Sequence, residues 1–455
     1  MSYSHKSLLI SVVGIVTAVA LGVGLALAGP TGFLLFGAVV ALGVVIWKPE
    51  VAFFISLLSM IVGQLIRLPL FGGDNAVIIN DLLLPLLIVV WSVRRLLSGT
   101  WTLPRHSLTL PTLAVMSCMA LSLVINSATY SLTEVLSGAL YQVRWIEYAA
   151  VLAMGFDFFR VPTRAWAYLK ILVAAGVVVS LLGFIQLQVF PDFTSMVPQG
   201  WDPHVGRLLS TWFDPNFLAG WLSFLVTITT AVALSQPWRQ AKWWWIASVV
   251  MTMAIILTFS RSGYVALVAG VGIVTLFRSR TLLLIGLIGM VMTIMFVPRV
   301  QERVIGIRTV DETAQLRIVS WKNAFEVISD YPWLGVGYNV YKYVQIDYGF
   351  LDKTNEHSAS GSDSSLLSIW VTTGILGLLS YLWLFVAMLR EAWVTWHSTH
   401  VSKAWRSVGL GIFAGLFGLL LHAQFVNSLL YPHIMQTIWL SLAMIIMIRQ
   451  PHART

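Results

Sequence analysis

The fold is decided by the stretch WWWIASVVMTMAIILTFSRSGYVALVAGVGIVTLF, residues 243–277, in which a short polar break separates two long apolar runs. Each run, at 243–259 and 262–277, approaches the roughly 20 residues that an α-helix needs to cross the hydrocarbon core of a bilayer. Arg261 lies in the break between the runs. The stretch therefore predicts two membrane helices with an arginine at their connection.

The composition of the whole chain agrees with this stretch. Of the 455 residues, 58% are hydrophobic and only 10% are charged, which excludes a soluble domain because such a domain covers its surface with polar groups. The alternating pattern of membrane barrels is absent, so helices are expected to cross the bilayer. We predict an all-α polytopic integral membrane protein, a single transmembrane domain over residues 1–455 with about 12–14 spans. The predicted spans are residues 7–29, 31–47, 51–68, 80–94, 110–126, 141–159, 168–189, 216–235, 243–259, 262–277, 281–298, 364–389, 406–425 and 430–448.

Basic residues in the short connections indicate the orientation, since such residues are retained on the cytoplasmic side. Lys48, Arg94 and Arg278 fall on one side when successive spans alternate in direction. Both termini are then cytoplasmic, and the first span is expected to be a retained signal anchor. The opposite face has two long connections, at about 190–215 and 299–363, which face the periplasm or the cell exterior.

Other classes of function find no support in the sequence. The net charge of +9 arises largely from the cytoplasmic anchors, and no basic stripe is interleaved with aromatic residues, so no nucleic-acid partner is expected. Cys118 is the single cysteine and lies in an apolar span, which excludes a disulfide framework and a cysteine-based metal site. We expect no cofactor and no metal, and membrane lipids as partners.

Three arginines are predicted on the outer face, where short connections are usually depleted in arginine. They are Arg207 in GRLLSTWFDPN, Arg261 in LTFSRSGYVAL and Arg317 in QLRIVSW. Each alone is equally compatible with an arginine that reaches to lipid phosphates or pairs with a nearby carboxylate. Three at one membrane surface favour a binding site for an anion.

A helix start lies between two of these arginines. In DPNFLAGWLSF, Asp214 is predicted to be the N-cap and Pro215 the first helical residue. The amide end of this helix points outward and attracts anions. Together with Arg207 and Arg261 it forms a predicted cradle for a phosphate or pyrophosphate. The alternative is a well-capped helix with no ligand.

The outer loop at about 299–363 is rich in aromatic residues and is expected to fold. Ile318, Trp321, Phe325 and Ile328 recur at helical spacing and predict an amphipathic helix on the membrane plane, with Arg317 at its beginning and Pro332 after its end. This helix either contacts a substrate or packs on the bundle as a lid.

Ionisable residues gather before the span that starts at 364, in TNEHSASGSDSSLL. His357 and Asp363 are candidates for a catalytic base, although Asp363 is also a possible helix N-cap and His357 a possible surface residue. Trp333 and Tyr338 are weaker candidates for stacking on sugar rings, with interfacial anchoring as the alternative. Asn216 is a further weak candidate for contact with glycan or lipid.

Residues of about 200–445 resemble the O-antigen ligase and polymerase superfamily of bacterial envelope glycosyltransferases. The resemblance rests on four blocks in the right order and on a pair of apolar spans that contain polar residues, LLHAQFVNSLLYPHIM. The four blocks are RLLSTWFDPNFLAGWL, LTFSRSGYVAL, RIVSWKNAFEVISDYPWLGVGY and DSSLLSIWVTTGILGLLSYL.

The resemblance implies a GT-C-like fold and an inverting, metal-independent glycosyltransferase in the bacterial cytoplasmic membrane. Its donor would be an oligosaccharide on undecaprenyl pyrophosphate, and its active site would face the periplasm or the cell exterior. Arg207 and Arg261 match positions that hold the pyrophosphate, and Arg317 matches the arginine that opens the loop helix. Guanidinium groups would then stabilise the charge that grows on the departing diphosphate.

The sequence departs from the family at one position. Ligases of the family have a histidine about a dozen residues before Gly-x-x-Gly, whereas counting back from Gly374 and Gly377 reaches Asp363. Position favours Asp363 as the base and intrinsic basicity favours His357, with a slight preference for Asp363. Because the ligase motif is broken, we favour polymerisation of a lipid-linked glycan over ligation to lipid A core.

A transporter or flippase is the main alternative from another class, because many spans also suit translocation. Intramembrane charges are few. Arg144 and Glu147 lie one turn apart and are predicted to pair with each other within one helix. His422 and Asn427 are expected either to line a cavity or to bridge helices by hydrogen bonds.

Overall fold

The computed structural model describes residues 43, 46–65, 67–69, 76–100, 106–302, 312–351 and 361–450. The predicted span 7–29 and most of 31–47 lie outside this part of the chain. The chain divides into two compact units, one of residues 1–56 and 82–101 and the other of residues 57–81 and 102–455. All of the candidate site residues belong to the second unit.

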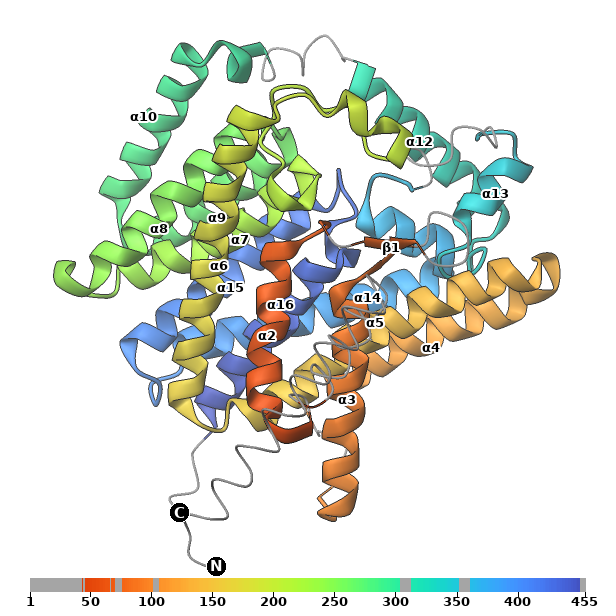
Figure 1. Cartoon of the computed structure of the whole chain (residues 1–455), viewed down its shortest axis with the longest axis horizontal. Coiled ribbons are helices and arrows are strands. Elements are labelled where there is room, and N and C mark those ends of the chain that lie inside the picture. Colours follow the sequence, from red (N-terminus) through yellow and green to blue (C-terminus); the bar gives the residue numbers. More distant parts are fainter. Residues whose placement is uncertain are drawn as a thin grey trace, which may run out of the picture. The chain divides into compact units, whose positions relative to one another are not determined.

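Almost all of the regular structure is helical, which confirms the all-α class (Figure 1). Two strands of three residues each form a small antiparallel ribbon that pairs Arg67 with Ile78. The α-helices are α2 (Pro49–Val62), α3 (Ile79–Leu97), α4 (Thr109–Asn126), α5 (Leu132–Phe158), α6 (Pro162–Val189), α7 (Pro215–Ala233), α8 (Trp238–Leu257), α9 (Arg261–Arg278), α10 (Arg280–Phe296), α12 (Glu312–Asp330), α13 (Tyr341–Asp347), α14 (Ser365–His397), α15 (Lys403–His422) and α16 (Pro432–Arg449). The strands are β1 (Arg67–Pro69) and β2 (Ala76–Ile78), and short 3₁₀ turns are η1 (Ser127–Thr129), η2 (Thr194–Gln199), η3 (Ser210–Trp212) and η4 (Ser428–Leu430).

Within the described residues, eight helices are long and apolar enough to cross a membrane, so the protein is an integral membrane protein. They are α4, α6, α7, α8, α9, α14, α15 and α16. Shorter apolar helices occupy Phe53–Val62 and Arg280–Phe296. The larger predicted number of spans includes segments that the structure does not describe, and it stays a prediction.

Two predicted boundaries are wrong. The span expected at 51–68 ends at Val62, because Gly63 turns the chain with a φ of 57° and the next amide, of Gln64, donates to Thr211 O at 2.8 Å. The span expected at 141–159 starts earlier, at Leu132. There Ser131 and Glu134 form a capping box, a local signal that the apolar pattern alone does not include.

Helix α7 forms the centre of the larger unit. Nearly every residue from Pro215 to Ala233 is buried, and α7 packs against α8, α9 and α15. Small residues allow this close packing: a Cβ at Gly411 of α15 would lie 2.6 Å from Ile228 Cα. By contrast α10 has no buried residue and packs on α9 at the edge of the unit (Figure 1). The start of α7 is therefore held rigidly by its neighbours.

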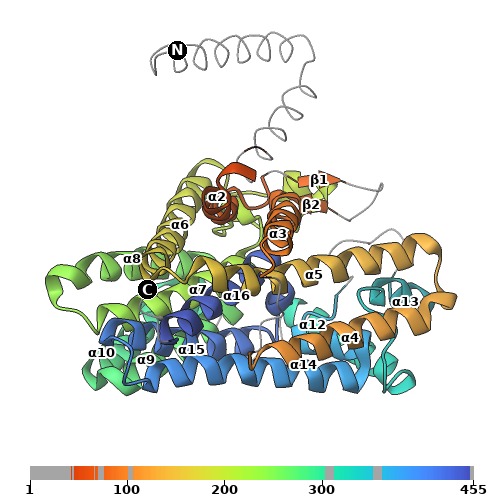
Figure 2. The same ribbon diagram turned by 90° about the horizontal axis from the view of Figure 1, so that it is seen from below.

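Helix α14 is broken in its second quarter, at Gly374, whose φ of 66° and ψ of −171° are not helical. The segment 332–337 fills the break: Val336 N donates to Val371 O at 3.0 Å and Gly337 N to Thr372 O at 3.1 Å. Helix α4 runs beside α14, and its Ser122 Oγ donates to Thr372 O at 2.6 Å (Figure 2). The carbonyls freed by the break are thus paired with protein groups, as a broken membrane helix requires.

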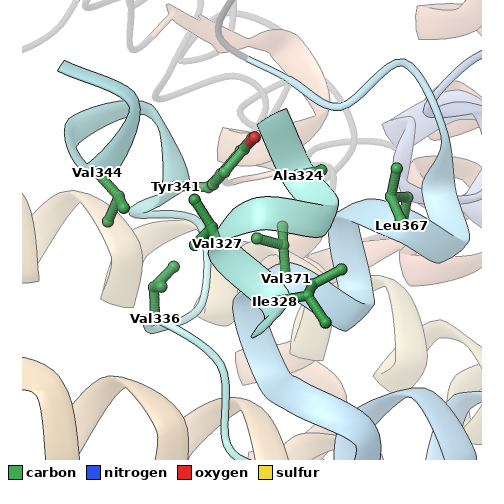
Figure 3. Packing of buried hydrophobic residues seen from close by; sticks show 8 residues of the cluster. All are labelled: Ala324, Val327, Ile328, Val336, Tyr341, Val344, Leu367 and Val371. Carbon is green, nitrogen blue, oxygen red and sulfur yellow. The ribbon is translucent and has the colours of Figure 1, made fainter. Parts of the chain in front are cut away.

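The amphipathic helix predicted in the outer loop is confirmed as α12. Its buried face consists of Ala324, Val327 and Ile328, which pack with residues of α13 and α14 in one hydrophobic cluster (Figure 3). Ile318 and Phe325, which were also predicted on this face, are 40% and 52% exposed. The hydrophobic cluster fixes α12 on the start of α14, so α12 packs on the bundle, and contact with a substrate stays a prediction.

Arg144 forms an ion pair with a residue of another helix, which the sequence did not predict, and its charge also interacts with the predicted partner Glu147. Arg144 Nη2 lies 2.7 Å from Asp81 Oδ2, in the first turn of α3, and its guanidinium also covers the ring of Tyr141. The short contact between this guanidinium and carboxylate is a charge-assisted hydrogen bond. Arg144 therefore connects α5 to Asp81 in the first turn of α3.

Candidate functional site

Two loops that contain the first two outer arginines are joined by hydrogen bonds. Leu208 N donates to Leu257 O at 2.9 Å, and Arg207 Nε donates to Thr258 O at 2.8 Å. The first loop precedes α7, and the second connects α8 to α9. The sequence blocks GRLLSTW and LTFSRSG, about fifty residues apart, are thus direct neighbours.

Asn216, in the first turn of α7, links these loops. Its Oδ1 accepts a hydrogen bond from Ser260 Oγ at 2.8 Å and lies 3.5 Å from Arg207 Nη2. Ser260 is also the N-cap of α9, since its hydroxyl accepts from Gly263 N. Arg261 follows as the first residue of α9. The structure therefore brings Arg207, Asn216 and the start of the Arg261 helix together.

The predicted cap of α7 is confirmed, and it changes the expected role of this helix end. Asp214 Oδ1 accepts from Asn216 N at 2.7 Å and from Phe217 N at 3.0 Å, and Pro215 is the first helical residue. The carboxylate thus occupies two of the amides that were expected to attract an anion. Burial raises the pKa of Asp214, while these two hydrogen bonds and the charge of Arg207 lower it. An anion at this end would depend on the arginines more than on the helix terminus.

Arg317 and Asp363 come together because α12 packs on the start of α14. One turn after Arg317, Ser320 Oγ donates to Gly361 O at 3.1 Å, and the ring of Trp321 lies 5.9 Å from that of Phe425. Burial raises the pKa of Asp363 above its ordinary value, Arg317 lowers it, and Asp202 raises it further. Arg317 therefore lies close enough to Asp363 for their charges to interact.

Asp363 is not the N-cap of α14, so that alternative is wrong. Ser364 is the cap, with its hydroxyl accepting from Leu367 N at 3.3 Å. Asp363 instead has a left-handed backbone, with a φ of 51°, a conformation that aspartate tolerates better than most residues. Its side chain is left available for another role. His357, the other candidate base, lies outside the described residues.

Trp333 and Tyr338 occupy very different environments. Trp333 is 69% exposed and follows the end of α12, so its ring is accessible. Tyr338 is 7% exposed, and its carbonyl oxygen would lie 2.7 Å from a Cβ at Gly138 of α5. Burial raises the pKa of Tyr338, with the Arg144 charge opposing. The ring of Tyr338 therefore offers little surface to a sugar, whereas that of Trp333 offers a face.

The end of α15 and the loop between α15 and α16 contact α7 and the start of α14. Asn427 Oδ1 accepts from Ser368 Oγ at 2.9 Å, which confirms that Asn427 bridges helices. His422, at the end of α15, is fully buried, and its ring lies against Gly220 of α7. The start of α14 is thus fixed to the same helices that hold Asn216 and Arg207.

Two residues near the site were missed by the sequence analysis. Asp202 is exposed and lies near enough to Asp214 and Asp363 to raise the pKa of both. Arg299, at the root of the outer loop, contacts the residues before Arg207. Asp202 gave a signal in the sequence, an acidic residue five positions before Arg207. Arg299 resembled an ordinary interfacial arginine after a span.

Within this integral membrane protein, two groups of charged residues thus lie where helices begin: Arg207 with the start of the Arg261 helix, and Arg317 with Asp363. Residues 246–382, from α8 into α14, match the family model described as O-antigen ligase. The match supports the resemblance to the O-antigen ligase and polymerase superfamily over this part of the chain, and this family is one of membrane glycosyltransferases. The match includes Arg261, Arg317 and Asp363, while Arg207 precedes it. No curated protein matches the chain.

Proposed function

We propose that the protein polymerises a glycan carried on undecaprenyl pyrophosphate at the outer face of the bacterial cytoplasmic membrane, by inverting glycosyl transfer. The observation that supports this most is the pair of hydrogen bonds by which Asn216 joins the Arg207 loop to Ser260, the N-cap of the Arg261 helix. A diphosphate has several anionic oxygens, and planar guanidinium groups from separate loops match such a group well.

In the proposed reaction, an acceptor hydroxyl oxygen attacks the anomeric carbon of the lipid-linked sugar. The bond between that carbon and the diphosphate oxygen breaks, and undecaprenyl pyrophosphate departs with the bonding electrons. Arg207, Arg261 and Arg317 would stabilise the charge that appears on the departing group. Asp363 would accept the hydroxyl proton, and the burial that raises its pKa makes it a stronger base than an exposed aspartate.

No metal is required in this proposal. In the part of the chain that the structure describes, no three His, Cys, Asp or Glu side chains are grouped so that they could hold a metal ion. The arginines would then supply the positive charge that a divalent cation supplies in other enzymes that use lipid donors. We expect a chelator to leave turnover unchanged; loss of turnover that is restored by magnesium or manganese would contradict this.

Ligation of the glycan to lipid A core is the second candidate function, and the match of residues 246–382 to the O-antigen ligase family favours it. Transport is less well supported. A broken helix such as α14 occurs in transporters, but here the backbone of 332–337 fills the break and pairs with its carbonyls.

One experiment separates these functions. Purified protein in vesicles is given a labelled repeat unit on undecaprenyl pyrophosphate, with and without lipid A core. A ladder of products without lipid A core supports polymerisation, and a single transfer that needs lipid A core supports ligation. Label that crosses the vesicle membrane without any transfer would replace the enzymatic proposal with transport.

A further inference from the structure

Arg299 contacts both of the loops that precede the two proposed pyrophosphate arginines. Its guanidinium donates to the carbonyl oxygens of Val205 and Gly206, the two residues before Arg207. The same guanidinium lies over the ring of Phe259, 4.4 Å from its centroid, two residues before Arg261. Arg299 itself belongs to neither loop, since it follows α10 at the root of the outer loop.

Two of the contacted residues, Gly206 and Phe259, are the points at which their loops turn. Gly206 has a φ of 59° and Phe259 a φ of 50°, and both values lie in the left-handed region. Glycine adopts this conformation freely, whereas for phenylalanine it is strained and needs support from its surroundings. The cation over the Phe259 ring is such support.

A side chain at Gly206 would displace the Arg299 guanidinium. A Cβ at this position would lie 2.6 Å from Arg299 Nη1, so glycine is needed both for its backbone conformation and for the approach of the guanidinium. The direction of the Arg207 side chain thus depends on the turn at Gly206, which the hydrogen bonds from Arg299 stabilise.

We propose that Arg299 is a positioning residue that sets the relative placement of Arg207 and Arg261, so that both can bind one diphosphate. This inference rests on the proposed function of the site. A guanidinium can donate to two adjacent carbonyls while its plane covers a ring, because its donors form a planar fork, whereas a lysine ammonium is a compact point charge without this geometry.

The test compares Arg299→Lys and Arg299→Gln with the wild-type protein. Both substitutions are expected to lower kcat/KM for the lipid-linked donor by on the order of 10²-fold, the effect of misplacing a binding group by about 1 Å. Acceptor KM is expected to stay unchanged, and the melting temperature without ligand is expected to fall only slightly, because Arg299 supports two loops and no helix. Gly206→Ala should reproduce the loss. Arg160→Lys, whose arginine pairs with Asp157 at the far end of α5, is the matched control.

A second measurement does not depend on turnover. Inorganic pyrophosphate is expected to raise the melting temperature of the wild type and to raise that of Arg299→Lys much less. If the wild type transfers no glycan in any assay, the proposed function fails, while this binding test still decides the role of Arg299.

The double variant Arg207→Lys/Arg299→Lys tests how Arg299 acts. A residue that works through Arg207 should add little to the loss caused by Arg207→Lys alone. The inference is overturned if the fold-losses in kcat/KM of Arg207→Lys and Arg299→Lys multiply in the double variant. It is also overturned if Arg299→Lys has wild-type kinetics and a wild-type response to pyrophosphate.

Discussion

Asn216 Oδ1 accepts a hydrogen bond from Ser260 Oγ at 2.8 Å, so that the first turn of α7 is fixed to the cap of α9. The same oxygen faces Arg207 Nη2 at 3.5 Å. Because the amide oxygen is neutral, it orients the guanidinium without cancelling its charge.

The first prediction concerns these contacts of Asn216 with Ser260 and Arg207. Asn216→Ala is expected to lower kcat/KM for the donor by about tenfold, the effect of losing a hydrogen bond to a charged group that contributes roughly 1.5 kcal/mol. Asn216→Asp should lose more, because a carboxylate beside Arg207 neutralises the guanidinium. Steady-state kinetics with labelled donor measures both effects, and Gln240→Ala, an exposed change at the start of α8, is the control. Equal activity of Asn216→Asp and the wild type would remove the anion-binding role of Arg207.

The second prediction concerns pH. If Asp363 is the base, it acts only when ionised, so the rate must fall as the pH drops through the pKa of its carboxyl group. Burial raises this pKa, Arg317 lowers it and Asp202 raises it. Asp202→Asn should therefore move the acid limb of the rate profile to lower pH, and Arg317→Gln should move the limb of the residual activity to higher pH.

The pH profile of kcat/KM measures these shifts, with Asp157→Asn at the opposite end of the helices as the control. A limb that stays in place in Asp202→Asn and also in Asp363→Asn would show that another group, such as His357, is the base.

The third prediction concerns the break in α14. A Cβ at Gly374 would lie 2.2 Å from the carbonyl carbon and oxygen of Trp333, and the φ of 66° is unfavourable for alanine. Gly374→Ala is expected to displace the segment 332–337 and to cost about 1–3 kcal/mol of stability, as is typical when a special backbone conformation is lost. The melting temperature in detergent measures the loss. Gly272→Ala in α9, where a Cβ meets nothing within 4 Å, should leave the melting temperature almost unchanged.

The sequence predicts the parts of this fold that depend on local chemistry. Asp214 and Pro215 are recognisable as a helix start because the cap and the first helical residue are adjacent in the chain, and α12 is recognisable from its spacing of apolar residues. The break at Gly374 is not recognisable in TTGILGLL, because it depends on a segment about forty residues earlier whose backbone pairs with the freed carbonyls.

The same distinction holds within the candidate site. Arg207 and Arg261 are recognisable as outward arginines, but their connection through Asn216 requires packing between α7 and α9. Arg144 pairs with Asp81, 63 residues away, and no local pattern distinguishes that partner from Glu147. Arg299 is indistinguishable in the sequence from an interfacial anchor, and only its contacts with both loops indicate its role.

The fourth prediction concerns a buried charge at the other end of α14. Glu391 is 2% exposed, accepts a hydrogen bond from Ser107 Oγ and pairs with Arg449 at the end of α16. His106 Nε2 also lies 3.7 Å from its carboxylate. This cluster joins the start of α4 and the end of α16 to α14. Glu391→Ala leaves Arg449 without its carboxylate and should cost about 3–5 kcal/mol, the usual effect of breaking a buried ion pair.

Thermal unfolding in detergent measures this loss. Arg390→Ala is the comparison, because Arg390 Nη1 also lies 3.6 Å from the Glu391 carboxylate but is 66% exposed, so its loss should contribute little. The cluster lies at the opposite ends of the helices from the arginine site, so residual folded Glu391→Ala protein should keep the wild-type donor KM. A changed donor KM with an unchanged melting temperature would mean that Glu391 acts on the site and not on stability.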